Sequence, residues 1–266
     1  MTSQHKKIIL KEQLSLILLF TKQELFDRYR YSLLGRTWLI LQPLIYILIF
    51  TLVFSSIMKT RLSDFNDDYA YSIYLVSGLL IWTAVSNVII RLSSVYQDKA
   101  ALIKKVPINL MIMPLYIPLV EAVIYLISMF LFAVILILVG YEFTWLWLWL
   151  PILLLISLGF AYIIGLLFAL LSPFISDIRH AVPVLFQLLF WMTPIIYLPS
   201  IIPAPYRWII ELNPFAGIVH HFQQVIFFKN IPSISTLLIM SCVSLLLLAM
   251  VYKLYTHLEK DIRDLI

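Results

Sequence analysis

Glu121 is the residue of this sequence whose type and position most directly indicate chemistry. It lies deep inside an apolar run at about 115–139, and an acid among hydrocarbon side chains is costly unless it is paired or functional. Arg91 and Arg36 lie near the ends of neighbouring apolar runs, and either could supply the partner charge. A proton relay would require several such acids, so we interpret Glu121 as an ion-pair partner or a polar position lining a channel.

Five tyrosines inside the apolar runs are the next candidates. A buried tyrosine needs a partner for its hydroxyl, and its aromatic ring can also stack on the face of a sugar. Packing within the protein is the default role, and lining of a channel is the alternative. Together with Glu121, the candidates for channel lining are Tyr46, Tyr71, Tyr74, Tyr125 and Tyr162.

The sequence lacks the signatures of enzymatic or cofactor chemistry. The adjacent His220 and His221 are not accompanied by the cysteines or carboxylates that would complete a metal site. The chain has six glycines and no G-x-x-x-x-G-K-[ST] phosphate loop. Its single cysteine, Cys242, permits no disulfide within the chain. We therefore predict no catalytic residue, no metal site and no cofactor in this chain.

The elements that position these residues are long and apolar. The 266 residues are 62% hydrophobic and 12% charged, and a membrane-spanning helix needs roughly 20 mostly apolar residues. The apolar stretches are continuous, whereas a β-barrel would show alternating segments of about ten residues. We predict an all-α polytopic membrane protein, one transmembrane domain over 1–266 with six transmembrane helices. The predicted spans are 36–58, 70–91, 115–139, 148–171, 180–197 and 234–255.

The charge distribution predicts the topology. The chain carries 19 Lys and Arg residues and a net charge of +5, and basic residues favour the cytoplasmic side of a membrane protein. With six spans and a cytoplasmic N-terminus, the basic residues outside are only Lys59, Arg61, Arg207 and Lys229. We therefore predict that both termini are cytoplasmic, with 256–266 as a cytoplasmic tail, and that the basic excess reflects topology and not nucleic acid binding.

The N-terminal segment 1–30 contains an amphipathic pattern. An apolar face and a lysine-rich polar side between 8 and 26 indicate a cytoplasmic interfacial helix. A short leader packed on its own bundle is the alternative. The apolar face holds Leu10, Leu14, Ile17, Leu18 and Leu25, and the polar side holds Lys11, Glu12, Ser15, Lys22 and Glu24.

The loop at 92–111 is the only substantial cytoplasmic connection between the predicted spans. Asp98 can cap a short helix there, and Pro107 can end it. A solvated basic loop is the plain interpretation, and a rigid helix that docks on a cytoplasmic partner is the alternative. The docking residues would be Asp98, Lys99, Ala101, Leu102, Lys104 and Lys105.

The external segment 198–233 is rich in proline yet apolar. Asn213 is a favourable N-cap, and Pro214 suits the first position of a helix. We predict short helices that re-enter the outer leaflet, since broken backbone is tolerated there where protein shields it. We also hypothesise that an apolar stripe in this segment closes the outer end of a channel. The stripe consists of Phe215, Ile218, Val219 and Phe222.

Three motifs, in order along the chain, resemble one family of transport proteins. Segment 30–43 reads RYSLLGRTWLILQP, and segment 212–217 reads LNPFAG. Between them, 177–183 reads DIRHAVP and continues to Gln187, Trp191, Thr193-Pro194-Ile195 and Tyr197. In residue type, order and spacing, the chain resembles the membrane permeases of polysaccharide-exporting ATP-binding-cassette transporters. The resemblance runs from the N-terminal helix to the last span.

The resemblance implies partners and a cargo. Permeases of this family pair as two copies around a continuous channel, and each copy is served by a cytoplasmic ATPase subunit that holds ATP and Mg. They export undecaprenyl-type lipid-linked O-antigens, capsular polysaccharides or teichoic acids across the bacterial cytoplasmic (inner) membrane. Segment 98–105 matches the position of the family's coupling helix, and 203–228 matches its re-entrant gate helices.

The resemblance also implies a mechanism of transport without covalent chemistry. The lipid diphosphate of the substrate would meet basic residues at the cytoplasmic entrance, for which Arg30 and Arg36 are the candidates. A permease for drugs or small lipids is the alternative, because the same architecture would serve it. A secondary carrier would show broken helices in both halves, whereas broken backbone is predicted here only toward the C-terminal half.

Overall fold

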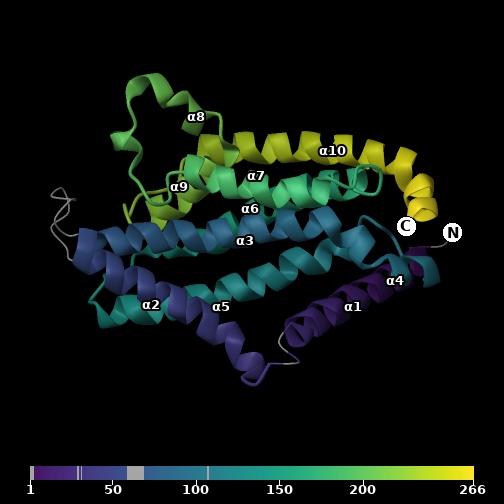
Figure 1. Cartoon of the computed structure of the whole chain (residues 1–266), viewed down its shortest axis with the longest axis horizontal. Helices are drawn as coiled ribbons and strands as arrows, with labels where there is room; N and C mark the ends of the chain where they lie inside the picture. The colour runs from purple at the N-terminus through teal and green to yellow at the C-terminus, as the bar shows by residue number, and fades with distance from the viewer. Residues whose placement is uncertain (1–2, 29, 31, 59–68, 107) are drawn as a thin grey trace.

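The protein is built from helices. The computed structural model describes residues 3–28, 30, 32–58, 69–106 and 108–266, and these form helices and turns without a strand among them (Figure 1). The predicted helix end at Pro107 and the predicted external Lys59 and Arg61 lie outside the described residues. Short 3-10 helices cover Gly35–Thr37, Met113–Leu115, Trp145–Trp149, Pro199–Ile201 and Ala204–Tyr206.

Five of the described helices are long and apolar enough to cross a membrane. They coincide with five predicted spans, which confirms a multi-pass helical membrane protein. Two of them exceed the predicted lengths, because α3 continues to Asp98 and α10 continues to Leu265. The five are α2 (Trp38–Met58), α3 (Ala70–Asp98), α5 (Tyr116–Leu138), α6 (Leu150–Leu171) and α10 (Ile234–Leu265).

The predicted span at 180–197 forms a shorter helix, α7 (Ile178–Met192). Its 15 residues extend about 22 Å at 1.5 Å per residue, less than the roughly 30 Å of a hydrocarbon core. The helix stops because Pro194 holds Thr193 in extended backbone, with φ −102° and ψ 133°. Helix α7 is therefore too short to cross the membrane by itself as a sixth span.

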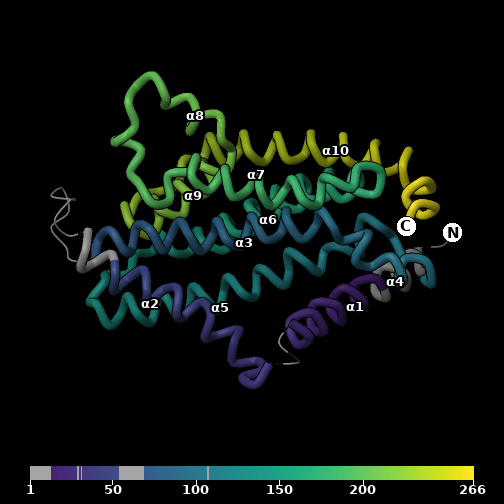
Figure 2. Tube along the Cα trace, in the orientation of Figure 1, coloured from purple at the N-terminus to yellow at the C-terminus, as the bar shows by residue number. Residues whose placement is uncertain are grey.

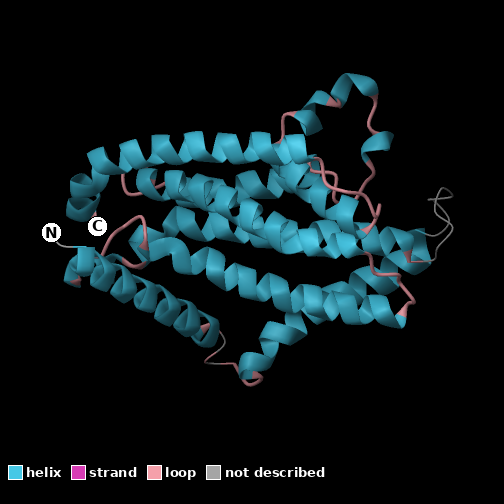
Figure 3. Ribbon diagram, turned by 180° about the vertical axis from the view of Figure 1, so that it is seen from behind, coloured by secondary structure: helices cyan, strands magenta, loops and turns pink. Residues whose placement is uncertain are grey.

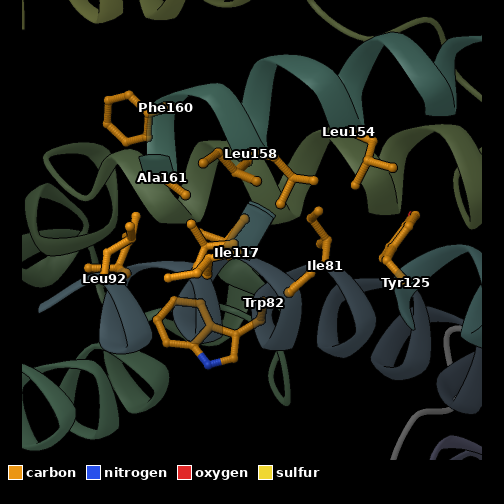
Figure 4. Packing of buried hydrophobic residues seen from close by; sticks show 14 of the residues in the cluster. Ile81, Trp82, Leu92, Ile117, Tyr125, Leu154, Leu158, Phe160 and Ala161 are labelled. Atoms are coloured by element: carbon orange, nitrogen blue, oxygen red, sulfur yellow. The ribbon is translucent and has the colours of Figure 1, made fainter. Parts of the chain in front are cut away.

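Helix α3 lies at the centre of the bundle. It packs against α2, α5, α6, α7 and α9 (Pro214–Ile226). The close approach of α6 depends on Gly165, where an added Cβ would lie 2.4 Å from Leu92 Cδ1 of α3. Figure 4 shows the layer between the two helices, with Ile81 and Leu92 of α3 opposite Leu154, Leu158 and Ala161 of α6.

The ends of the helices define two ends of the bundle (Figure 1; Figure 2). The start of α1 (Ser3–Asp27), the short α4 (Ala100–Lys105) and the end of α10 lie together at what we call the α4 end. Helix α8 (Trp208–Glu211) projects near the other end, the α8 end. The view from behind shows α1 as an arm that diverges from the other helices (Figure 3).

Helix α1 packs one face on the bundle and leaves leucines outside. Ile17 is buried, and the ring of Phe20 lies 6.0 Å from that of Tyr116 in α5, edge to face. Leu14 and Leu18, predicted on the same face as Ile17, are each 57% exposed. The apolar residues expected on one face are thus divided between the bundle and the outside.

Helix α4 forms where a short helix was predicted, but the predicted cap at Asp98 is wrong. Helix α3 continues through Asp98, so Lys99 becomes the N-cap of α4 and makes no side-chain capping bond. Asp98 Oδ2 accepts a hydrogen bond from Ser94 Oγ at 2.7 Å instead. Ile103 is buried and anchors α4, while the two lysines at its end are exposed.

Candidate functional site

An ionic cluster joins α1, α3 and α5. Glu121 is 1% exposed and accepts a hydrogen bond from Arg91 Nη1 at 2.8 Å. The other nitrogen of that guanidinium, Nη2, donates to Glu24 Oε1 at 2.7 Å. The predicted pairing of Glu121 with Arg91 is therefore confirmed. Arg36, the other predicted partner, lies instead 4.0 Å above the ring of Phe26.

Three further side chains complete the cluster. Asn87 Nδ2 donates to Glu121 Oε2 at 3.2 Å, and Arg28 Nη2 lies 3.4 Å from Glu121 Oε1. Lys99 Nζ, directly before α4, lies 3.8 Å from Glu24 Oε2. The ionic cluster, as we use the term, consists of Glu24, Arg28, Asn87, Arg91, Lys99 and Glu121.

Hydrogen bonds make the buried carboxylate of Glu121 tolerable. Taking a charge out of water carries an effective penalty of several kcal/mol, which is offset only by close partners with good geometry. Here two guanidinium groups and one amide point at a single carboxylate. Arg28 directly follows α1, and Asn87 and Arg91 belong to α3, which also binds Glu24 of α1. The cluster therefore stabilises one arrangement of α1, α3 and α5, and through Lys99 it reaches the start of α4.

A cavity of about 620 Å³ lies beside the cluster, between α2, α3 and α5. Arg28, Asn87 and Glu121 line its polar side, and side chains such as Leu79 line its apolar side. Tyr125 also lines this cavity, and its buried hydroxyl has no hydrogen-bond partner among the described residues. The cavity therefore offers charge and hydrocarbon surface in one place, while the Tyr125 hydroxyl itself is shielded from it.

The residues predicted to line a channel divide into two groups. Tyr46, Tyr125 and Glu121 line this one cavity. The hydroxyls of the other three donate to backbone carbonyls, which indicates packing within the chain. These are Tyr71 to Ile196 at 2.7 Å, Tyr74 to Pro194 at 2.9 Å, and Tyr162 to Met111. That any of the six lines a channel stays a prediction.

Neutral side chains hold the irregular backbone that follows α7. The carbonyl of Pro194 accepts hydrogen bonds from Tyr74 Oη at 2.9 Å and from Gln223 Nε2 at 3.2 Å. Asn213 Nδ2 donates to Thr193 Oγ1 at 3.0 Å. Buried backbone groups outside a helix require such partners. We call this group the outer clamp, and it consists of Tyr71, Tyr74, Asn213, Gln223 and segment 193–197.

Helix α9 begins as predicted and buries the proposed gate stripe. Asn213 Oδ1 accepts a hydrogen bond from Phe215 N at 3.0 Å, which confirms the N-cap. The ring of Phe215 lies 5.2 Å from that of Phe186 in α7, and the ring of Phe222 lies 5.9 Å from that of Tyr125. The structure thus gives the stripe a packing role inside one copy, and gating stays a prediction. The whole stripe is buried, namely Phe215, Ile218, Val219 and Phe222.

The predicted entrance and docking residues lie mostly on the surface. Arg30 and Arg36 are exposed, and Arg30 Nη1 lies 3.8 Å from Asp27 Oδ1. In the predicted docking set, Lys99 turns inward and lies 5.7 Å from the ring centroid of Tyr116. The residues of that set that are exposed are Asp98, Ala101, Lys104 and Lys105, and Leu102 is half-buried.

The adjacent histidines are hydrogen-bonded near the α8 end. His221 is 4% exposed, and its Nε2 lies 3.0 Å from Thr236 Oγ1. Burial, and secondarily the neighbouring His220, lower the pKa of His221 to about 4. His220 Nε2 lies 3.1 Å from Gln224 Nε2. Within the described part of the chain, no three His, Cys, Asp or Glu side chains are grouped to hold a metal ion.

Sequence reasoning missed Glu24, Arg28 and Asn87 as parts of the site. Glu24 was predicted on the polar side of α1, yet it lies seven residues after the buried Ile17 and so shares the helix face that packs on the bundle and meets Arg91. A usable signal was the spacing, because Glu24 and Arg28 are four residues apart, as are Asn87 and Arg91. Residues at this spacing share one helix face. Two polar pairs at this spacing, together with one acid in an apolar run, therefore indicate that the three segments meet through polar side chains.

Comparison with known proteins places these features in a family context. The model of the family described as ABC-2 type transporter matches residues 15–227. Two proteins from Klebsiella pneumoniae, each described as O-antigen export system permease protein RfbA, are 24% identical over 213 residues, 79% of this chain and of theirs. A protein from Myxococcus xanthus with the same description is 24% identical over 235 residues, 88% of each chain.

Proposed function

Since the chain belongs to the ABC-2 type transporter family, we propose that it is the membrane permease of an ATP-driven exporter for a lipid-linked surface polysaccharide. The single observation that carries the proposal is similarity along 79–88% of the chain to permeases described as O-antigen exporters. Capsular polysaccharide and teichoic acid are the other members of the proposed cargo class. ATP hydrolysis belongs to a separate ATPase subunit, as in other transporters of this family.

The proposed assembly consists of two copies of this chain and two cytoplasmic ATPases in a bacterial inner membrane. Both termini are cytoplasmic in this proposal. The start of α1 and the end of α10 lie at the same end of the bundle (Figure 1), which requires an even number of crossings. Five long helices give an odd number, so α7 together with segment 193–197 serves as the sixth crossing.

The outer clamp supports a re-entrant position for α9 in the proposed topology. The hydrogen bonds from Tyr74 and Gln223 satisfy the carbonyl of Pro194 without water. Helix α9 is buried against α3 and α6, while most of 199–212 is exposed. An α9 that dips into the outer leaflet therefore has its polar backbone and its apolar face covered by protein.

We propose that α4 couples the ATPase to the membrane helices. It exposes Ala101, Lys104 and Lys105 at the α4 end, and Ile103 fixes it to the bundle. A push on α4 reaches α3 directly, and it reaches α1 through the contact of Lys99 with Glu24. The ionic cluster then carries the displacement to α5, because buried charged groups resist separation.

A complementation experiment tests the proposed function. Deleting the gene for this chain in its host should remove polysaccharide from the cell surface and cause lipid-linked polysaccharide to accumulate inside. Wild type should restore export, and the charge-reversed Lys104→Glu, Lys105→Glu variant should not, while its amount in the membrane stays normal. A normal surface polysaccharide in the deletion strain would contradict the assigned cargo.

Labelling from the two sides tests the topology separately. Cys242 is exposed, so Cys242→Ala provides the background. A membrane-impermeant maleimide should label Lys229→Cys from outside and Lys104→Cys only after the cytoplasmic side is opened. Labelling of both positions from the same side would remove α7 as a crossing.

A further inference from the structure

The segment that follows α4 is not helical, yet it is fixed in place. We call residues 108–112 the post-α4 segment, and they lie between α4 and the 3-10 turn that begins at Met113. Asn109 Oδ1 accepts hydrogen bonds from the backbone N–H groups of Met111 at 2.8 Å and of Ile112 at 3.2 Å. Leu110 is 0% exposed. The segment is therefore a defined turn and not a loose connection.

Side chains from three helices hold the carbonyl groups of the post-α4 segment. Buried carbonyl groups outside a helix need such partners. Because each donor belongs to a different helix, the segment is tied to α3, α6 and α10 at once. The bonds run from Tyr96 Oη of α3 to Leu110 O at 2.8 Å, from Tyr162 Oη of α6 to Met111 O, and from Arg263 Nη2 of α10 to Ile108 O at 2.7 Å.

Arg263 is the charged donor among these three, and the length of α10 brings it there. The 32 residues of α10 extend about 48 Å at 1.5 Å per residue, so the helix reaches well past a hydrocarbon core of roughly 30 Å to the α4 end (Figure 1). Ile262 is 0% exposed, which packs the last turn on the bundle. Glu259 Oε1 accepts a hydrogen bond from Arg263 Nη2 at 3.1 Å and orients the guanidinium. Charge-assisted hydrogen bonds are the strong ones, so loss of Arg263 would loosen the segment beside α4.

A fixed post-α4 segment determines where a displacement of α4 goes. Helix α4 has six residues, and Ile103 is the one that is buried, so the bundle holds it by little contact of its own. Its start is linked to α1 through the contact of Lys99 with Glu24. Its other end continues toward the carbonyl held by Arg263. If that end were loose, the connection would bend and absorb the displacement.

We propose that Arg263 is a positioning residue for coupling. Its bond to Ile108 stiffens the post-α4 segment, so that a displacement of α4 is passed to α10 and, because α10 packs against α6, to α6 as well. The ionic cluster serves the side of the bundle formed by α1 and α5, and Arg263 serves the side formed by α10 (Figure 1; Figure 3). That an ATPase displaces α4 rests on the proposed function.

Hydrogen exchange in the permease alone tests whether Arg263 fixes the segment. In nanodiscs without the ATPase, Arg263→Met removes the donor and keeps an apolar stem. The amide protons of Met111 and Ile112 should then exchange about tenfold faster, as expected for the loss of one hydrogen bond from a charged group. The matched Lys260→Met, at an exposed cation three residues earlier on α10, should change their exchange less than about twofold. Unchanged exchange in Arg263→Met, or an equal increase in Lys260→Met, would overturn the proposal.

Transport per ATP tests whether this fixation serves coupling. In membrane vesicles that hold the permease with its ATPase, Arg263→Met should lower the polysaccharide moved per ATP hydrolysed about fivefold, near the lower end of usual coupling between sites. Arg263→Lys keeps the charge and a donor, so it should restore most of this ratio. A merely structural role would lower the amount of folded complex and leave the ratio unchanged, and that outcome would overturn the proposal. If Arg263→Met does not accumulate, Arg263→Gln, whose side chain ends before the position of the guanidinium, is read in the same way.

The outcomes for Arg263 and for the proposed function are distinguishable. A wild-type complex that moves no lipid-linked polysaccharide would contradict the proposed function, and exchange at Met111 in the permease alone would still decide whether Arg263 fixes the segment. Faster exchange in Arg263→Met with a normal transport ratio would overturn the coupling role and leave the exporter proposal standing.

Discussion

The ionic cluster and the outer clamp place polar groups inside the same apolar bundle by different means. The cluster uses charged side chains from α1, α3 and α5, with Glu121 at its centre. The outer clamp uses neutral tyrosine, asparagine and glutamine side chains, and most of its hydrogen bonds end on backbone carbonyls of 193–197. The ionic cluster holds separate helices to one another, whereas the outer clamp satisfies backbone carbonyls left without helical partners after α7 ends.

The difference follows from what each region must satisfy. A broken helix leaves carbonyl groups that any neutral N–H or O–H can pair with, so charges would add desolvation without benefit. Helices that meet only through side chains can be held by ion pairs, which resist separation yet re-form when the helices return. We therefore expect the clamp to be static, and the cluster to be the region that responds when α4 moves.

The largest effect is expected where α9 enters the core beside the clamp. Truncating a buried Phe costs about 3–5 kcal/mol, so replacing both Phe215 and Phe222 with Ser should cost about 6 kcal/mol or more. That loss is comparable to the total stability of many domains. The double variant should fail to accumulate as folded protein, measured as the monodisperse fraction after detergent extraction. Leu212→Ser, at a position 74% exposed, is the matched control.

This double variant also decides between packing and gating. A folded complex that leaks small ions at rest would show that the stripe closes a channel and contributes little to the core. That outcome would erase the distinction between a static outer region and a responsive inner one.

The next effect is expected in the ionic cluster. Glu121→Gln leaves Arg91 and Arg28 without their shared carboxylate, and breaking a buried pair in this way costs about 3–5 kcal/mol. The thermal midpoint in detergent should fall accordingly. Glu142→Gln is the matched control, because Glu142 is 89% exposed in its 3.4 Å pair with Lys229, and exposed pairs contribute about 0–1 kcal/mol. Equal shifts in the two variants would contradict a buried ionic role for Glu121.

A smaller effect is expected from the packing of α3 against α9. An added Cβ at Gly78 would lie 2.7 Å from Gln223 Nε2 and 3.0 Å from Val219 Cγ1. Gly78→Ala should therefore displace Gln223 from Pro194 and cost about 1–3 kcal/mol, the usual range for overpacking. At Gly159 an added Cβ meets nothing within 4 Å, so Gly159→Ala should be neutral or slightly stabilising. Similar thermal midpoints for the two variants would show that Gln223 can be displaced from Pro194 without a loss of stability.

The long helices could be predicted from the sequence because their signal is local. Runs of about twenty apolar residues identify α2, α3, α5, α6 and α10, and Asn213-Pro214 identifies the start of α9. The end of α7 was harder to predict from the sequence, because Thr193-Pro194 breaks the helix while the residues on both sides of the break remain apolar. Asp98 was misassigned as a cap because nothing in the local pattern shows that α3 continues through it.

The site was only partly predictable because its contacts join distant residues. Glu121 stands out alone in an apolar run, but its partner Arg28 lies 93 residues away and resembles any basic residue at a membrane surface. Tyr125 and Tyr74 have the same sequence signal, yet one lines a cavity and the other caps a backbone break. Which of two tyrosines faces a cavity depends on helix rotation, which is fixed by packing.

The smallest effect is a pH dependence near the clamp, where buried groups are expected to be neutral. Burial lowers the pKa of His221 to about 4 from its ordinary value of 6.5. The unfolded chain therefore binds a proton on His221 at a higher pH than the folded chain does, so this contribution to stability is complete above about pH 6.5 and is lost as the pH falls toward 4. The thermal midpoint of wild type should fall between pH 7 and pH 5, and that of His221→Gln should fall less. Thr236→Val removes the hydrogen-bond partner of His221 but no titrating group, so it should lower stability and keep the wild-type pH slope. An unchanged slope in His221→Gln would mean that His221 gains a proton equally in both states, and that the outer region tolerates charge as the ionic cluster does.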